Sequence, residues 1–222
     1  MMNPSPPDYE RAAALAAETL SRFGIDSTPV SPFPILKRLP GVLVMTYQSI
    51  SEKTSQDYQQ VLSSFGENRD AFTTVHSENG KLKYIVTYNQ RLSEVLIQRA
   101  LARELGHILL AHDGTLPEET RNAEAICFAH HLLVPRPLIH LLEVTNVRLT
   151  VDVIGNLTGC YDHCLFCMRH LPGTHVPADL NRAVRDNFMD FFKNFFEYQR
   201  TVASSDRSAV ADLGTYMDGY EE

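Results

Sequence analysis

Apolar side chains recur along the first part of the chain at helical and then at strand spacing. Between residues 8 and 23 they return every three or four positions, which predicts a packing helix. A shorter helix is expected over 29–39, and a strand over 42–47, where apolar residues follow a Pro-Gly pair. Residues 51–66 are polar and follow neither spacing.

A hairpin followed by a helix is the strongest pattern in the middle of the chain. Residues 71–76 and 82–88 are rich in β-branched and aromatic side chains, and Asn79-Gly80 between them is a strong turn signal. From about residue 94 to 111 the apolar positions take helical spacing. The sequence therefore predicts two antiparallel strands directly before an amphipathic helix.

Helical patterns dominate the rest of the chain. A helix is expected over 118–133, two short helices over 149–171, and a long helix over 178–198 whose phenylalanines have the spacing of a packed face. With the hairpin, these elements predict an α+β fold.

Composition and charge indicate which classes of partner and which cell compartment to expect. Lysine and arginine number 20 against 27 acidic residues, a net charge of -7, which argues against a sequence-independent nucleic-acid surface. No apolar run approaches the roughly 20 residues that span a bilayer, and the start lacks the pattern of a signal peptide. We therefore expect a cytoplasmic protein with no membrane partner.

Three of the four cysteines are clustered. Cys160, Cys164 and Cys167, with His163 and His170 nearby, are compatible with a zinc cluster. Their spacings of four and three also place them on one helix face, where cysteines pack as small apolar side chains. The buried stripe is the favoured interpretation, and no disulfide is expected.

The helix after the hairpin carries a damaged metal-binding motif. Zinc proteases place H-E-x-x-H on a helix, with two histidine ligands on one face and the glutamate beside the metal-bound water. Here Glu104 and His107 stand in register, but Arg103 occupies the position of the first histidine.

The motif and its surroundings resemble the ImmA/IrrE family of zincin-like metallopeptidases. Residues 101–110 read LARELGHILL where the family has lAHELGHxxL, and residues 124–135 read EAICFAHHLLVP where it has EANxFAxxLLMP. A strand ending in Tyr88-Asn89 precedes the motif helix, as it does in that family.

This resemblance implies a fold and a division of the chain. It implies a zincin-like metallopeptidase domain of helices and a small antiparallel sheet over residues 8–142. A C-terminal helical extension is expected over 146–198, and an acidic, mobile tail over 199–222.

The resemblance also implies roles for individual residues. Glu104 matches the general base, His107 the second zinc ligand and Glu124 the downstream carboxylate ligand, while Ile126 replaces a usual asparagine. Family members cut helix-turn-helix repressors of mobile elements or stress regulons, and others sit beside an antitoxin-like partner. These activities are expected here only as far as the zinc site survives.

Arg103 opposes zinc in two ways. Its guanidinium has no lone pair to offer, so one of three protein ligands is lost. A unit cation about 5 Å from a dication is also repelled by roughly 6 to 7 kcal/mol at an effective dielectric of about 20. No zinc is therefore expected unless the site is rescued, and Arg103→His is predicted to restore zinc uptake.

Two nearby residues are candidates to replace the missing histidine ligand. Cys127 lies one turn after Glu124, so these two and His107 could form a makeshift site. His112 lies five residues after His107, which places it on another face of the helix unless the helix end unwinds. A buried, inert Cys127 is the competing interpretation.

The competing structural interpretation gives Arg103 the place of the metal. Its guanidinium would pair with Glu124 or with Glu104 and so neutralise an acidic pocket. His130 and His131, further along the next helix, are expected near solvent.

Three functions remain open on the sequence alone. The first is a pseudo-peptidase that regulates by binding a repressor or antitoxin in its cleft. The second is an active zinc peptidase with rearranged ligands that cleaves a repressor. The third is a DNA-associated module using residues 149–171 as a helix-turn-helix, which the acidic balance disfavours.

Overall fold

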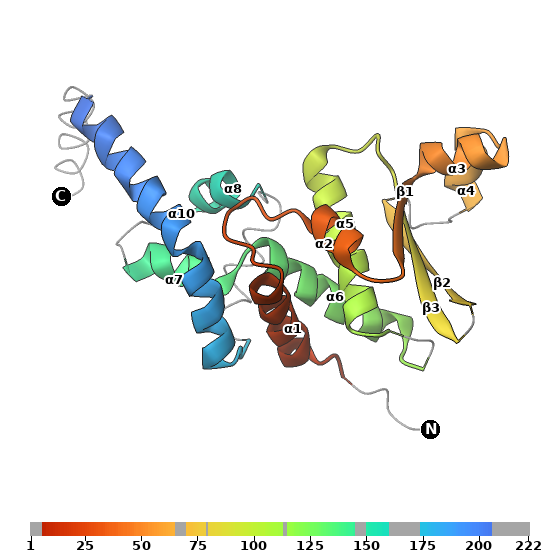
Figure 1. The fold of residues 1–222 in the computed structure, drawn as a ribbon, viewed down its shortest axis with the longest axis horizontal. Coiled ribbons are helices and arrows are strands. Elements are labelled where there is room, and N and C mark those ends of the chain that lie inside the picture. The colour runs from red at the N-terminus through yellow and green to blue at the C-terminus, as the bar shows by residue number, and fades with distance from the viewer. Residues whose placement is uncertain are drawn as a thin grey trace, which may run out of the picture.

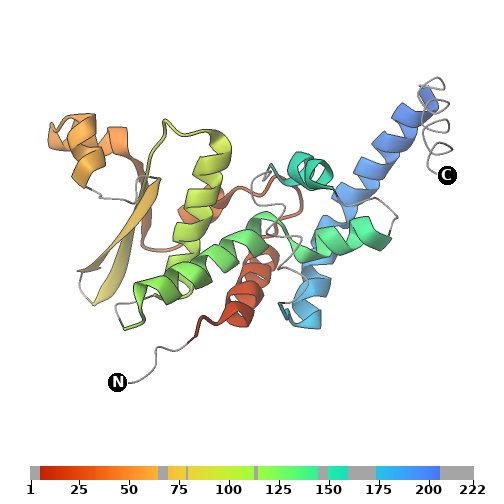
Figure 2. The same cartoon turned by 180° about the vertical axis from the view of Figure 1, so that it is seen from behind.

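The three strands lie at one end of the molecule and the long C-terminal helix at the other, with most of the remaining helices between them (Figures 1 and 2). The structure is a computed structural model that describes residues 6–64, 70–78, 80–112, 115–144, 150–159 and 174–205. The mixture of helices and one small sheet confirms the predicted α+β class.

The sheet has the strand order β1-β3-β2. The predicted hairpin is confirmed: β2 (Ala71–Glu78) and β3 (Lys81–Tyr88) pair antiparallel, with Ala71 opposite Tyr88. The expectation of a purely antiparallel sheet is wrong, because β1 (Val42–Thr46) pairs with β3 in parallel. Two helices and β2 separate β1 from β3, which gives the long crossover that parallel pairing requires.

The polar stretch without a clear pattern forms two short helices, α3 (Tyr47–Thr54) and α4 (Tyr58–Ser64). The strand predicted to run through Tyr47 ends at Thr46, whose side chain accepts a hydrogen bond from the backbone of Ser49 and caps α3. Tyr47 and Tyr58 form a small separate core with Val61.

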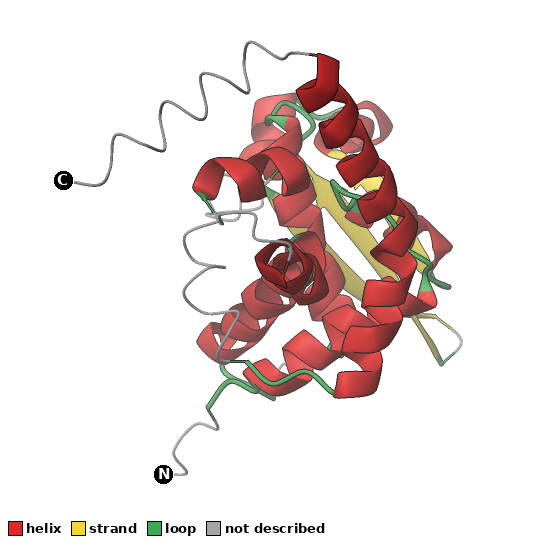
Figure 3. Ribbon diagram, turned by 90° about the vertical axis from the view of Figure 1, so that its left-hand side faces the viewer, coloured by secondary structure: helices red, strands yellow, loops and turns green. Residues whose placement is uncertain are grey.

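Four helices form the centre of the molecule. They are α1 (Tyr9–Arg22), α2 (Pro32–Arg38), α5 (Glu94–Leu109) and α6 (Glu118–Leu133). Helix α5 packs against β2 and β3 on one side and against α6 on the other. Figure 3 shows the sheet and the helices that accompany it.

Gly106 lets α5 and α6 approach closely. A Cβ atom at this position would lie 3.0 Å from the ring of Phe128 and 3.2 Å from the backbone of Ala125. The glycine inside the Glu104–His107 motif therefore serves packing, and it holds the two helices that carry the candidate site side by side.

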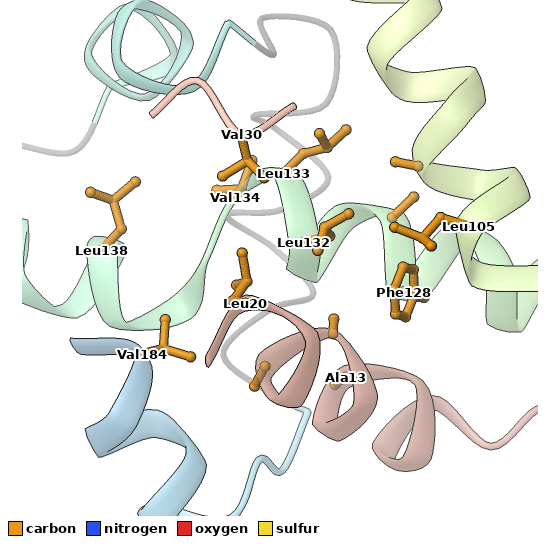
Figure 4. Close-up of a cluster of buried hydrophobic side chains, with 14 of the residues drawn as sticks. Ala13, Leu20, Val30, Leu105, Phe128, Leu132, Leu133, Val134, Leu138 and Val184 are labelled. Carbon is orange, nitrogen blue, oxygen red and sulfur yellow. The ribbon is translucent and has the colours of Figure 1, made fainter. Parts of the chain in front are cut away.

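One apolar core joins α1, α5, α6 and the C-terminal helices. Ala13, Leu105, Phe128 and Leu132 are among the buried side chains that meet there (Figure 4). These residues come from three helices, so the core fixes the position of α5 relative to α6.

The C-terminal part is helical, as predicted. It contains α7 (Arg136–Val144), α8 (Val151–Thr158) and α10 (Ala178–Ser205), which packs against α1 and α7. Phe188 and Phe192 are buried, as the phenylalanine spacing predicts, and α10 continues past its expected end at residue 198. The cysteine stripe at 160–167 and the tail from 206 lie outside the described residues.

None of the helices in the described part of the chain combines the length and apolarity needed to cross a membrane.

Candidate functional site

Glu104 and Arg103 form an ion pair beside the sheet. Nε and Nη2 of Arg103 both donate to Glu104 Oε1, at 3.3 and 3.0 Å. The hydroxyl of Thr73 on β2 donates to Glu104 Oε2 at 2.7 Å, so both carboxylate oxygens are engaged. The arginine therefore pairs with one of its two expected partners, and its Nη2 also donates to the carbonyl of Ala71 at 3.3 Å.

His107 is held in a neutral state. Its pKa is lowered to about 4, first by burial and then by His112, Arg103 and Arg121, while a hydrogen bond with the side chain of Asn122 acts in the opposite direction. Its Nδ1 lies 2.9 Å from Nδ1 of His112. His107 thus keeps its predicted position on α5, but its neighbours differ from those of a metal ligand.

His112 does not face away, because the predicted exception applies: the helix ends before it. Helix α5 ends at Leu109, and Ala111 takes a left-handed conformation with φ of 54°. The backbone then turns so that His112 N donates to the carbonyl of His107 at 3.1 Å. This reversal places the two imidazoles at 5.0 Å between ring centroids.

Glu124 on α6 is bound from two sides. Nε2 of His112 lies 2.9 Å from its Oε2, and the backbone N–H of Asp8 donates to its Oε1 at 2.8 Å. Arg11 in the first turn of α1 donates to the carbonyl of Leu110 at 2.9 Å. Glu124 therefore ties the start of α1 and the end of α5 to α6.

His112 uses both of its ring nitrogens in hydrogen bonds. An ionised carboxylate only accepts, so Nε2 of His112 carries the proton that Glu124 receives. On the other side of the ring, the Nδ1 atoms of His112 and His107 share one hydrogen bond, in which one Nδ1–H donates to the other nitrogen. The three side chains form a chain of hydrogen bonds in which the ring of His112 separates His107 from Glu124.

Cys127 is directed away from this chain of hydrogen bonds. Its thiol donates to the carbonyl of Tyr9 at 3.6 Å, and burial, followed by the charge of Glu124, raises its pKa to about 12. A zinc ligand must be a thiolate, which this environment opposes. The structure does not bring the makeshift set of His107, Glu124 and Cys127 together.

The residues present do not fit a catalytic zinc ion. Tetrahedral zinc needs three protein donors that converge about 2 Å from the ion, and hence about 3.3 Å from one another. Only two ring nitrogens, from His107 and His112, face one another, while Glu124 meets the opposite nitrogen of His112. In the described part of the chain, no three histidine, cysteine or carboxylate side chains gather so as to hold a metal ion.

A cavity of about 340 Å³ lies over these groups. Side chains of both signs and several apolar ones line it: Phe72, Thr73, Val75, Tyr84, Arg103, Glu104, His107, Ile108, His112, Glu118, Arg121 and Asn122. Its walls come from β2, β3, α5, α6 and the chain between the two helices. The damaged motif thus lies in a cleft large enough to receive side chains of another molecule.

His130 and His131 are not near solvent, contrary to the prediction. Both are buried, at 5% and 4% exposure. Burial, followed by the charge of Arg136, lowers the pKa of His131 to about 4. The expected end of α6 at Leu133 is correct, but it lies inside the molecule, so neither histidine is free at the surface.

Comparison with known families agrees with the resemblance. Residues 55–156 match the model of the M78 peptidase family, described as the IrrE N-terminal-like domain. The chain therefore carries an ImmA/IrrE-family domain, and the matched segment includes both the Arg103–His107 motif and Glu124. No curated protein matches the chain. The expected domain boundaries stay predictions.

Proposed function

We propose that this chain is a cytoplasmic regulatory protein that binds a helix-turn-helix repressor or an antitoxin-type partner without hydrolysing it. The observation that carries the proposal is the pairing of the motif's own side chains. Arg103 binds Glu104, and His112 lies between His107 and Glu124. The groups expected to hold an ion and to activate water, His107, Glu124 and Glu104, are therefore hydrogen-bonded to His112 or Arg103.

Glu104 lacks the freedom of a general base. A base must reach the proton that it removes, with its acceptor oxygen directed at that proton. Three hydrogen bonds from Arg103 and Thr73 direct both oxygens of Glu104 inward, and its exposed fraction is 4%.

The free edge of β2 offers a surface for an extended segment of the partner. Asn89 N donates to the carbonyl of Asp70 at 2.9 Å, which makes these two a hydrogen-bonded pair of the hairpin. The pairing alternates, so the backbone groups of Ala71, Thr73 and Val75 point away from β3. Arg103 already binds the carbonyl of Ala71. The backbone groups of Thr73 and Val75 that point away from β3 have no partner among the described residues, which leaves them for β-augmentation.

Binding and cleavage can be separated with any helix-turn-helix or antitoxin-type protein that is encoded next to the gene of this chain. We expect the wild-type chain to bind that partner and to leave it intact by mass spectrometry after overnight incubation with added zinc. Glu104→Gln should bind with similar affinity, because it removes no group at the cleft opening. Zinc-dependent cleavage that Glu104→Gln abolishes would overturn the proposal.

A zinc peptidase with rearranged ligands is the second candidate. The Nδ1 atoms of His107 and His112 face each other at 2.9 Å, close to the separation of two ligands on one ion. This candidate requires His112 to release Glu124 so that the carboxylate can turn to the same ion. One zinc per chain, lost in both His107→Ala and His112→Ala, would favour it.

A further inference from the structure

Arg121 is the side chain of the cavity whose bonding is least complete. Its Nε atom is buried and has no hydrogen-bond partner among the described residues. A buried N–H without a partner costs free energy, and a guanidinium has five donors to satisfy. Other atoms of Arg121 line the cavity together with its neighbour Asn122, so a ligand in the cavity would contact this side chain.

The carboxylates of the cavity do not satisfy Arg121. Glu104 is bound by Arg103 and Thr73, as described above. Glu118 is exposed, and among the described residues it forms no ion pair with Arg121 although the two lie three positions apart on α6. The positive charge of Arg121 is felt inside the cavity, since it contributes to the lowered pKa of His107.

An apolar wall faces this charge. Val75 on β2 is 52% exposed, and with Tyr84 and Ile108 it lines the same cavity. An exposed valine beside a positive donor suits a segment in which a carboxylate side chain lies next to an apolar one. The cavity therefore combines the charge of Arg121, which forms no ion pair among the described residues, with apolar contact area.

We propose that Arg121 and Asn122 bind the carboxylate of a glutamate or aspartate in an extended segment of the protein partner, with the neighbouring apolar side chain of that segment packed on Val75. This inference rests on the proposed function. It adds which kind of side chain of the partner the cavity binds, namely a carboxylate next to an apolar side chain.

Three capped peptides test the charge preference. They are acetyl-Thr-Val-Glu-Val-Thr-amide and its counterparts with glutamine or lysine in place of glutamate, each with a fluorescent label for anisotropy. At low ionic strength the full-length chain should bind the glutamate peptide about tenfold more tightly than the glutamine peptide, and the lysine peptide least. Equal affinities, or no binding of any peptide at millimolar concentration, would overturn the inference.

Matched variants assign the preference to one side chain. Arg121→Gln should lower the affinity for the glutamate peptide to that for the glutamine peptide. Arg121→Lys should retain part of the preference for glutamate. Arg185→Gln is the control, since Arg185 is exposed on α10 and pairs with Asp186. A preference that persists in Arg121→Gln, with the variant folded by circular dichroism, would also overturn the inference.

A separate variant distinguishes failure of this inference from failure of the proposed function. Val75→Trp fills the cleft at an exposed position, and it should abolish binding of the co-encoded partner. If it does so while the peptides show no charge preference, the cleft binds the partner but Arg121 does not select it. If the partner binds Val75→Trp and wild type equally, the cleft is not the binding site and the proposed function is wrong.

Discussion

The imidazoles of His107 and His112 meet at their Nδ1 atoms, 2.9 Å apart, although five positions separate the two residues. A continuous helix would place them on different faces. The left-handed Ala111 ends α5 and returns His112 to the motif, where its other nitrogen reaches Glu124. The site therefore departs from a zinc site in two ways, by the substitution at Arg103 and by the hydrogen bonds of His112, of which only the first is evident from the sequence.

Restoring zinc should require changes at both positions. Arg103→His returns the first ligand but leaves His112 bonded to Glu124, so we expect well under half a zinc per chain. Arg103→His with His112→Asn frees the carboxylate and should bind about one zinc per chain, measured by plasma mass spectrometry after dialysis. Equal zinc in the single and double variants would show that His112 does not obstruct the site.

Stability should depend on the pair of Arg103 and Glu104. Arg103→Met leaves a carboxylate that is 6% exposed with only the hydroxyl of Thr73, which should lower the free energy of unfolding by about 1 to 2 kcal/mol. The loss is smaller than for a fully buried pair because the arginine side chain is 26% exposed.

Urea denaturation checks this pair through a double-mutant cycle. Arg103→Met with Glu104→Gln should be more stable than Arg103→Met alone, since no uncompensated charge remains. Arg185→Met, which breaks an exposed pair with Asp186, should change stability by less than about 0.5 kcal/mol. Additive effects of the two substitutions would contradict a direct interaction.

The left-handed turn at Ala111 should respond to the choice of side chain. Ala111 is exposed, so substitutions there change the backbone preference more than the packing. Ala111→Gly should leave the free energy of unfolding unchanged or raise it by up to about 1 kcal/mol, and Ala111→Val should lower it by about 1 to 2 kcal/mol. If glycine and valine gave equal stability, the turn would not have a left-handed residue at this position.

Acid should destabilise the protein through its buried histidines. The pKa of His131 is about 4 in the folded chain and 6.5 when exposed, so the unfolded state binds the proton first. The contribution of neutral His131 to the free energy of unfolding is complete above pH 6.5 and is lost as the pH falls toward 4. The pKa of His107 is lowered to about 4 as well, so its protonation also destabilises the folded chain as the pH falls.

The size of the His131 effect can be measured by comparing pH profiles. Between pH 7 and pH 5 the free energy of unfolding should fall by about 2 kcal/mol less in His131→Gln than in wild type. The comparison uses the slope with pH, so a constant loss from altered packing does not affect it. Parallel profiles would mean that His131 is protonated equally in both states.

Much of the fold follows from local pattern, and the sequence predicts it correctly. The hairpin around Gly80 and the bounds of α6 depend on turn chemistry and apolar spacing, which a single sequence displays. The parallel position of β1 depends on which strand it meets in space, and nothing in residues 42–46 records that choice.

In the candidate site, too, contacts between sequence neighbours can be predicted and contacts that depend on the fold cannot. The partnership of Arg103 with Glu104 is accessible to sequence reasoning because the two are neighbours on α5. The return of His112 is not, because alanine rarely takes a positive φ and the apolar spacing continues through Ala111. The bond from Asp8 to Glu124 joins residues 116 positions apart, which no local signal predicts.

The central claim is that the chain does not hold a catalytic zinc, because Arg103 replaces one ligand and His112 is hydrogen-bonded to the other two, His107 and Glu124. The most direct test is the zinc content of the purified full-length protein, measured by plasma mass spectrometry after incubation with excess zinc and gel filtration. We predict less than about 0.1 zinc per chain, unchanged in His107→Ala. About one zinc per chain that disappears in His107→Ala would contradict the account.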